Sequence, residues 1–277
     1  MNTATLTRTP SARGPRLLTR TLASEWSKLW SVRSTWWCLA SAAVLMVLST
    51  LTLGGAHSTD IANHNVPEKT FEASEAVVSA TTFVQFALIA MAMLVITSEY
   101  GSGLIRATFQ ATPVRGRVLA AKAMVLAPVM FVAGVVTGGI ATAVEYLLLS
   151  LDAFGGSIRV TPAGTVADLC TTGVYFALVS LLTVGLGAAM RSAAGTLTAA
   201  FMLVMGLPLT LAMSGSQVAL DISMRMPMFA GLAFMGSTDN LTGGRIPYSS
   251  AEGLAWLVAW AVLGLVAGHI VLRRRDA

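Results

Sequence analysis

Apolar residues are grouped along this chain into six long stretches, separated by shorter polar segments. None of the stretches alternates between apolar and polar residues with a period of two, which is the pattern of strands in a membrane barrel. About 20 apolar residues suffice to cross a bilayer as an α-helix, in which backbone polar groups are paired within the helix. The pattern predicts an all-α integral membrane protein with six transmembrane helices. The predicted spans are residues 35–53, 77–97, 123–150, 166–190, 195–213 and 253–272.

Composition supports lipid as the main solvent of the chain. Only 11% of the residues are charged, against about 25% in a typical soluble domain, and the mean hydropathy is +0.72. Residues 1–24 contain no apolar core of the kind found in a signal peptide, so we expect the first span to be retained. The expected organisation is a disordered tail over 1–15, an amphipathic helix over 16–34, a transmembrane domain over 35–272 and a tail over 273–277.

Basic residues divide unequally between the two sides of these spans. With a cytoplasmic N-terminus, fourteen lysines and arginines lie in cytoplasmic segments and four lie outside, in keeping with the positive-inside rule. Both termini are therefore predicted to be cytoplasmic. The same distribution accounts for the net charge of +5 by attraction to anionic lipid at the inner leaflet, which argues against nucleic acid as the partner. The four outer residues are Lys69, Arg159, Arg225 and Arg245.

Two cytoplasmic segments have features beyond charge. Before the first span, apolar residues recur at intervals of three and four, which predicts an amphipathic helix in the plane of the membrane interface. That helix either only anchors the chain or, as an elbow helix, also contacts a cytoplasmic partner. After the second span, Gly101 and Gly103 permit a sharp turn, and residues 104–110 form two predicted helical turns before Pro113. A short projecting helix of this kind can dock into a groove of another protein.

Four motifs from these segments are similar to those of a known family. They are Glu25-Trp26-Ser27-Lys28-Leu29, Arg33-Ser34-Thr35-Trp36-Trp37, Glu99-Tyr100-x-x-Gly103-x-Ile105-Arg106, and Pro113-x-Arg115-Gly116-Arg117-x-Leu119-x-Ala121-Lys122. Together with the six-span layout, they make the chain resemble the ABC-2 type permease subunits of bacterial ABC transporters, most of all the actinobacterial members.

The resemblance implies a location in the bacterial plasma membrane and a division of labour with other chains. Two copies of an ABC ATPase would bind ATP and Mg, and this chain would pair with itself or with a homologous permease. The segment after span two would carry the coupling helix that contacts the ATPase. The implied coupling residues are Glu25, Lys28, Arg33, Glu99, Tyr100, Gly103, Leu104, Ile105, Arg106, Arg115 and Arg117. Residues 214–252 would form short re-entrant helices with breaks at Pro227, Gly231 and Gly236.

Motifs for chemistry by the chain itself are missing from the sequence. There is no Gly-x-x-x-x-Gly-Lys-Ser/Thr phosphate loop, no His-Glu-x-x-His and no Gly-x-Ser-x-Gly. His57 and His64 share an outer segment, but their spacing does not indicate a metal site. Cys38 and Cys170 are expected near opposite membrane faces, too far apart for a disulfide. We therefore expect neither an enzyme nor a bound cofactor in this chain.

Two carboxylates near the outer ends of spans are candidates for a substrate path. Ionisable residues within spans are costly and often functional. Glu145 and Asp168 either line such a path or lie close enough to the outer interface to be solvated. Two glycine pairs, Gly134-x-x-x-Gly138 and Gly264-x-x-x-Gly268, are instead interpreted as helix contacts.

The preferred hypothesis is the permease subunit of an ABC-2 type exporter, moving its substrate outward by alternating access driven by a separate ATPase. A non-transporting membrane sensor or immunity protein would have the same topology. A proton-coupled secondary transporter is a third hypothesis, although such proteins usually have two related halves and ionisable groups near the midplane. The substrate is not indicated by the sequence.

Overall fold

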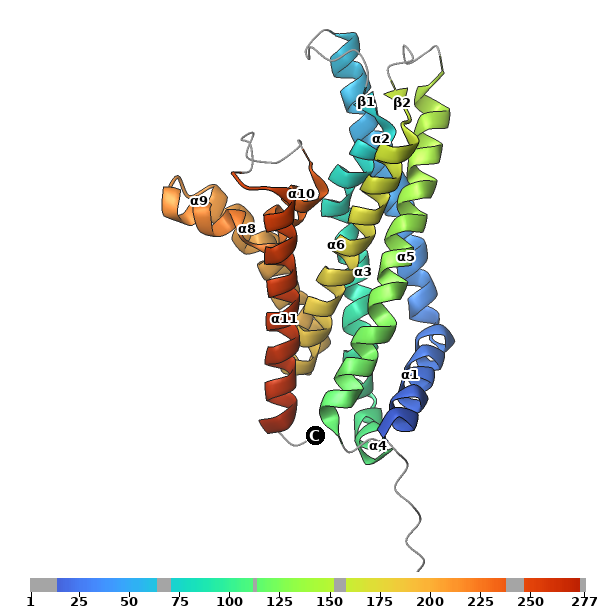
Figure 1. Cartoon of the computed structure of the whole chain (residues 1–277), viewed down its shortest axis with the longest axis vertical. Coiled ribbons are helices and arrows are strands. Elements are labelled where there is room, and N and C mark those ends of the chain that lie inside the picture. Colours follow the sequence, from blue (N-terminus) through green and yellow to red (C-terminus); the bar gives the residue numbers. More distant parts are fainter. Residues whose placement is uncertain (1–13, 64–70, 112–113, 152–157, 238–246, 275–277) are drawn as a thin grey trace, which may run out of the picture.

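A computed structural model of the chain describes residues 14–63, 71–111, 114–151, 158–237 and 247–274 (Figure 1). Most of the predicted tail over 1–15, His64 and residues 275–277 lie outside these ranges. The elements in chain order are α1 Gly14–Ser31, α2 Arg33–Ala62, β1 Phe71–Glu72, α3 Ala73–Gly101, α4 Leu104–Ala111, α5 Arg115–Leu149, β2 Ile158–Arg159, α6 Pro162–Met190, α7 Ala193–Phe201, the π-helix η2 Met202–Gly206, α8 Leu207–Ala212, α9 Gln217–Met224, α10 Pro227–Met235 and α11 Ser250–Arg274.

Six helical segments of the described chain are long and apolar enough to cross a membrane, as the sequence predicted. They are α2, α3, α5, α6, the continuous segment 193–212, and α11. Several helices run beyond the predicted spans, because hydropathy reports the part that suits lipid and not the end of the helix. The helix of the first span, α2, continues to Ala62 instead of ending near residue 53. Helix α5 begins at Arg115, eight residues before the predicted start of its span.

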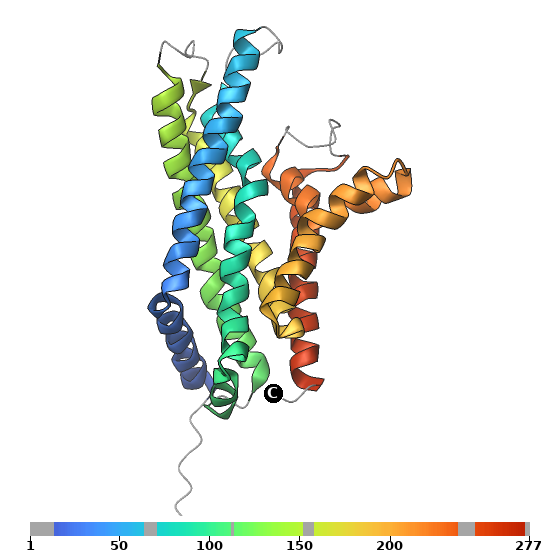
Figure 2. The ribbon, with the colours of Figure 1, turned by 180° about the vertical axis from the view of Figure 1, so that it is seen from behind.

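Three helices form the centre of the bundle. The apolar lengths of α3, α5 and α6 are mostly buried within the chain, whereas those of α2, 193–212 and α11 are mostly exposed. Helix α2 packs on α3 and α5, while α11 packs on α6. Figure 2 shows α2 and α5 side by side along the bundle, both running away from α4. We call the two ends of the bundle the α4 end and the β end.

Glycines allow α6 and α11 to approach closely. A side chain on Gly185 would overlap with the backbone of Gly264, and one on Gly268 would meet the carbonyl oxygen of Gly185 at 2.6 Å. Gly134 of α5 has a similar contact with Gly173 of α6. Both predicted glycine pairs therefore lie at helix contacts: backbones meet at Gly134, Gly264 and Gly268, and Gly138 makes room for the side chains of Leu169 and Val77.

At the β end, β1 and β2 form a two-stranded parallel pair in which Phe71 lies opposite Ile158. Glu72 pairs with Arg159 at 3.1 Å and accepts a hydrogen bond from the hydroxyl of Thr161 at 2.7 Å. This pairing connects the segment between α2 and α3 with the segment between α5 and α6.

The connection from α6 to the fifth candidate span is short, in keeping with the four residues between the predicted spans 166–190 and 195–213. Arg191 has a positive φ of 56° and Ser192 caps α7. Within this span the helix widens to the π form at residues 202–206, just before Pro208. Proline has no N–H to donate and its ring crowds the carbonyl four residues earlier, and a wider turn relieves both problems.

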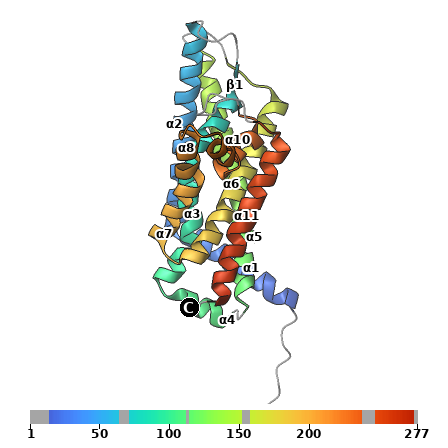
Figure 3. The ribbon, with the colours of Figure 1, turned by 90° about the vertical axis from the view of Figure 1, so that its left-hand side faces the viewer.

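Beyond residue 212, α9 and α10 are short and meet at a bend of 63°. Figure 3 shows the segment that contains α9 and α10 from the side. Pro227 begins α10, and Gly236 ends it with a positive φ of 72°, so two of the three predicted breaks are found. The predicted break at Gly231 is wrong: the glycine lies inside α10 and faces the ring of Tyr175, so it provides close packing instead of a turn.

Candidate functional site

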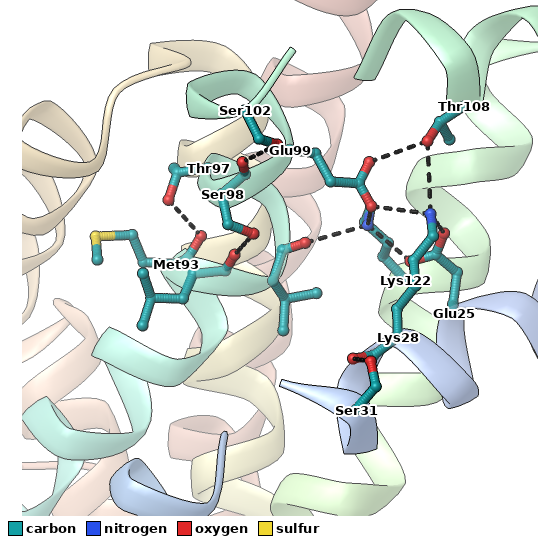
Figure 4. A network of polar contacts seen from close by, with 12 residues as sticks. Glu25, Lys28, Ser31, Met93, Thr97, Ser98, Glu99, Ser102, Thr108 and Lys122 are labelled. Atoms are coloured by element: carbon teal, nitrogen blue, oxygen red, sulfur yellow. Dashed lines mark hydrogen bonds and ion pairs between the residues drawn. The ribbon is translucent and has the colours of Figure 1, made fainter. Parts of the chain in front are cut away.

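Four charged side chains meet where α1, α3 and α5 converge at the α4 end (Figure 4). The ammonium of Lys122 lies 2.7 Å from a carboxylate oxygen of Glu25 and 2.7 Å from one of Glu99. Lys28 approaches the same two carboxylates, at 2.9 Å and 3.0 Å. Two positive and two negative charges thus alternate in space, and we call these four residues the ion network.

The ion network is largely shielded from solvent. Lys122 is 2% exposed, and Glu25 and Glu99 are also buried. The ammonium of Lys122 additionally donates a hydrogen bond to the carbonyl of Val95 at 3.1 Å, so its three protons all have acceptors. A buried charge is costly unless it is paired and hydrogen-bonded, and the network meets both conditions.

Lys28 differs because its side chain is 41% exposed. Partial burial by itself would lower the pKa of Lys28, but the hydrogen bonds and charges of Glu25 and Glu99 outweigh burial and raise the pKa above its ordinary value. Lys28 therefore stays protonated at neutral pH and forms the outer edge of the network.

Helix α4 is attached to this network through Thr108. The Thr108 hydroxyl lies 3.4 Å from a carboxylate oxygen of Glu99 and 3.5 Å from the ammonium of Lys28. The chain turns from α3 into α4 at Gly103, whose φ of 75° favours glycine. Ile105 points inward and is buried, whereas Leu104 and Arg106 are exposed. Helix α4 thus has one face against the bundle and one face free within the described chain.

A cavity of about 710 Å³ lies beside the network, with walls from α1, α2, α3, α4 and α5. Its lining changes from charged side chains, including Glu25, Lys28 and Glu99, to apolar ones such as Met91 and Leu126. Side chains therefore do not completely fill the space where these five helices meet, and the space beside α4 has both polar and apolar walls.

The structure thus brings together three of the predicted coupling residues, Glu25, Lys28 and Glu99. The fourth member, Lys122, ends the last of the four motifs but is not among the predicted coupling residues. Its signal in the sequence is a single lysine flanked on both sides by apolar residues, Val118-Leu-Ala-Ala-Lys122-Ala-Met-Val-Leu126. Such a lysine needs a buried carboxylate partner.

The remaining predicted coupling residues lie around the network or away from it. Arg33 begins α2 and is exposed, as is Arg117 on α5. The guanidinium of Arg191 lies 5.5 Å from the ring centre of Tyr100. Arg115 donates a hydrogen bond to the carbonyl of Leu272 at 2.7 Å, which joins the start of α5 to the last turns of α11.

Glu145 is not solvated, so that interpretation of its position is wrong. It is 0% exposed, because α2 continues past the predicted end of the first span and Gly54 covers the carboxylate. Asp168 is half-buried and accepts a hydrogen bond from Ser74 at 2.6 Å. The two carboxylates occupy separate helix contacts, Glu145 against α2 and Asp168 against α3.

Metal ligands are not gathered in the part of the chain that the structure describes: it contains no group of three or more histidine, cysteine, aspartate or glutamate residues placed to hold a metal ion. Cys38 and Cys170 are both free thiols, in agreement with the prediction that they do not pair.

Comparison with known proteins gives no family assignment. A scan against models of known protein families finds no match, and a search of curated proteins finds none either. The motif resemblance therefore stays a prediction, and the candidate function depends on the ion network and α4.

Proposed function

We propose that this chain is the membrane-spanning subunit of an ABC-2 type exporter, powered by a separate ATPase that docks on α4. The observation that carries the proposal is the attachment of a short, half-exposed helix to a buried ion network joining α1, α3 and α5. Six apolar helices of sufficient length provide the membrane-spanning part.

In this proposal the exposed and buried residues have different tasks. Leu104 and Arg106 would contact the ATPase, because both side chains are exposed on α4. Glu25, Glu99 and Lys122 are too deeply buried to contact another protein directly, so they would transmit a displacement of α4 to the helices. Closely packed helices respond to such displacements by rigid-body shifts, which is how alternating access is generated in many transporters.

The resemblance supplies the rest of the assembly. Two copies of this chain, or one copy and a homologue, would pair with two ATPase subunits, with α4 and both termini in the cytoplasm of a bacterial cell. Figure 1 shows α4 and the last turn of α11 at the same end of the bundle, as this orientation requires. ATP and Mg would bind only to the partner chains.

The test is co-purification with the phosphate-loop ATPase encoded beside this chain. We expect Leu104→Asp combined with Arg106→Glu to weaken the complex at least about tenfold, equivalent to ~1.4 kcal/mol, because a buried charge and a reversed charge would face the partner. Leu151→Asp is the matched control, since Leu151 is 54% exposed, close to the 60% of Leu104, but lies at the β end. The control should bind as the wild type does.

Unchanged binding and ATPase stimulation in the double variant would refute docking on α4. Binding without ATP-dependent export in the wild type would favour the non-transporting hypothesis, in which the chain only holds a partner at the membrane.

A further inference from the structure

A stripe of buried polar residues runs along the contact between α2 and α5, in the half of the bundle nearer the β end. On α2, Thr50, Gly54 and Ser58 follow at intervals of four residues and therefore share one face, which is buried. On α5, Thr142 and Glu145 are three residues apart and are also buried. We call these five residues the α2–α5 stripe.

Glu145 occupies the space that Gly54 leaves. A methyl group on Gly54 would overlap with the carboxylate oxygen Oε1 of Glu145 and would also touch Leu149. The fit between a glycine and a carboxylate is close, and no room is left between the two helices at this level for a second side chain.

None of the side-chain oxygen atoms in the stripe has a hydrogen-bond partner in the described part of the chain. This holds for both carboxylate oxygens of Glu145 and for the hydroxyls of Thr50, Ser58 and Thr142. Four buried polar side chains without partners on two helices that pack together are unusual, because most buried polar atoms are hydrogen-bonded.

Charged and titratable groups near this end of the bundle do not compensate Glu145. On α2 these are His57 and Asp60; on β1 and α3, Glu72 and Glu75; on β2, Arg159; on α5, Tyr146; and on α6, Asp168. The positive charge, Arg159, is 61% exposed and pairs with Glu72. Among the described residues, none of these groups forms an ion pair or hydrogen bond with Glu145. An ionised Glu145 would therefore be a buried charge without a counter-charge, which is strongly unfavourable.

A small cavity lies on the other side of Gly54. Its volume is about 330 Å³, and Gly54 lines it together with His57, Asp60 and Glu75. His57 is held there by edge contact with the ring of Phe71, 4.8 Å between ring centres. Gly54, a residue without a side chain, thus both contacts Glu145 and lines this cavity of polar side chains.

We propose that Glu145 is a proton-binding site that couples protonation to the contact between α2 and α5. The carboxyl holds its proton while the two helices are closed. When they part, the O–H bond of Glu145 breaks, the proton passes to water or to His57 in the small cavity, and the carboxylate is hydrated. Closed helices therefore favour the protonated form, and a rise in pH favours the open form. This inference does not depend on the proposed partnership with an ATPase.

Infrared spectroscopy of the full chain in lipid nanodiscs tests the protonation state. At neutral pH we expect the carbonyl stretch of a protonated carboxyl in the wild type, its loss in Glu145→Gln, and its retention in the control Asp168→Asn. If Glu145→Gln does not fold, Glu145→Asp serves instead and should shift the frequency of the band. A wild-type spectrum without the band, or a band that the substitutions of Glu145 leave unchanged, would overturn the proposal.

Coupling to helix separation is tested by thiol labelling. Ser58→Cys is introduced into a chain that carries Cys38→Ser and Cys170→Ser, and its labelling rate is compared in the presence and absence of Glu145→Gln. Because the same cysteine is present in both proteins, the change in thiol reactivity with pH cancels in the ratio of rates. As pH increases, we expect labelling of the protein that retains Glu145 to rise several-fold above that of the protein carrying Glu145→Gln.

A ratio that does not change with pH would contradict coupling. Stabilisation of the protein by sodium chloride over choline chloride, lost in Glu145→Gln, would also contradict the proposal, because it would identify an ionised carboxylate binding a metal cation instead of a proton.

Discussion

Lys122 lies on α5 between two apolar tetrads and is almost completely buried. Its charge is tolerated because Glu25 and Glu99 arrive from two other helices, α1 and α3. The two carboxylates depend on Lys122 in turn, since Lys28 contacts both from the more exposed edge. Lys122 is therefore the central lysine of the ion network and Lys28 the peripheral one, and substitutions of the two should differ in their effect on stability.

Lys122→Met should cost about 3–5 kcal/mol of stability, because it leaves two buried carboxylates with only one partner. Lys28→Met is the control and should cost about 1 kcal/mol or less, since a half-exposed ion pair contributes little. Thermal unfolding midpoints in detergent measure both. Adding Glu25→Gln and Glu99→Gln to Lys122→Met should recover much of the loss. Equal effects of the two lysine substitutions would show that the network has no buried centre.

The sequence predicted the number of membrane-spanning helices correctly but not where several of them begin and end. Hydropathy identified all six candidate spans, because long apolar stretches suit lipid. It did not show that α2 continues through the polar residues His57 to Asp60, since a helix needs only backbone pairing and outside support to continue. The buried position of Glu145 follows from that extension, so it could not be predicted either. The ion network was predicted only in part, because its centre joins three helices distant in sequence.

The glycines at the contact of α6 and α11 lead to a prediction about helix packing. Gly185→Leu should lower stability by about 3 kcal/mol or more, because the new side chain would have to separate the two backbones. Gly55→Leu is a matched control: it lies in a helix, but nothing is within 4 Å of the position of its missing side chain. Thermal unfolding of both variants gives the comparison. A loss of similar size in the control would contradict the prediction, because leucine is a better helix former than glycine and the control position has no neighbour to displace.

Over the whole molecule, exposed apolar side chains cover the outer faces of the bundle. On α5, for example, Val132, Val136 and Ile140 follow at intervals of four residues and are all about half exposed. In water such a surface would promote aggregation, whereas in a bilayer it is the expected surface. Burial inside the chain and contact with lipid together account for the apolar composition.

Val136→Arg should therefore impair membrane integration, by about 2.5–3.5 kcal/mol if the residue lies near the middle of the bilayer. Val136→Leu should integrate as the wild type does. The measurement is the fraction of chain that resists alkaline extraction from membranes. Equal integration of the arginine and leucine variants would show that this face of α5 does not contact lipid.

The contact between the start of α5 and the last turns of α11 has a consequence for how the chain is made. Arg115 donates to the carbonyl of Leu272, which follows it by 157 residues, and Gly116 faces His269. During synthesis the start of α5 therefore precedes its α11 partner by more than half of the chain. The hydrogen bond between Arg115 and Leu272 can form only after nearly all of the chain has been made, so the junction of α5 and α11 is among the last contacts of the bundle to be completed.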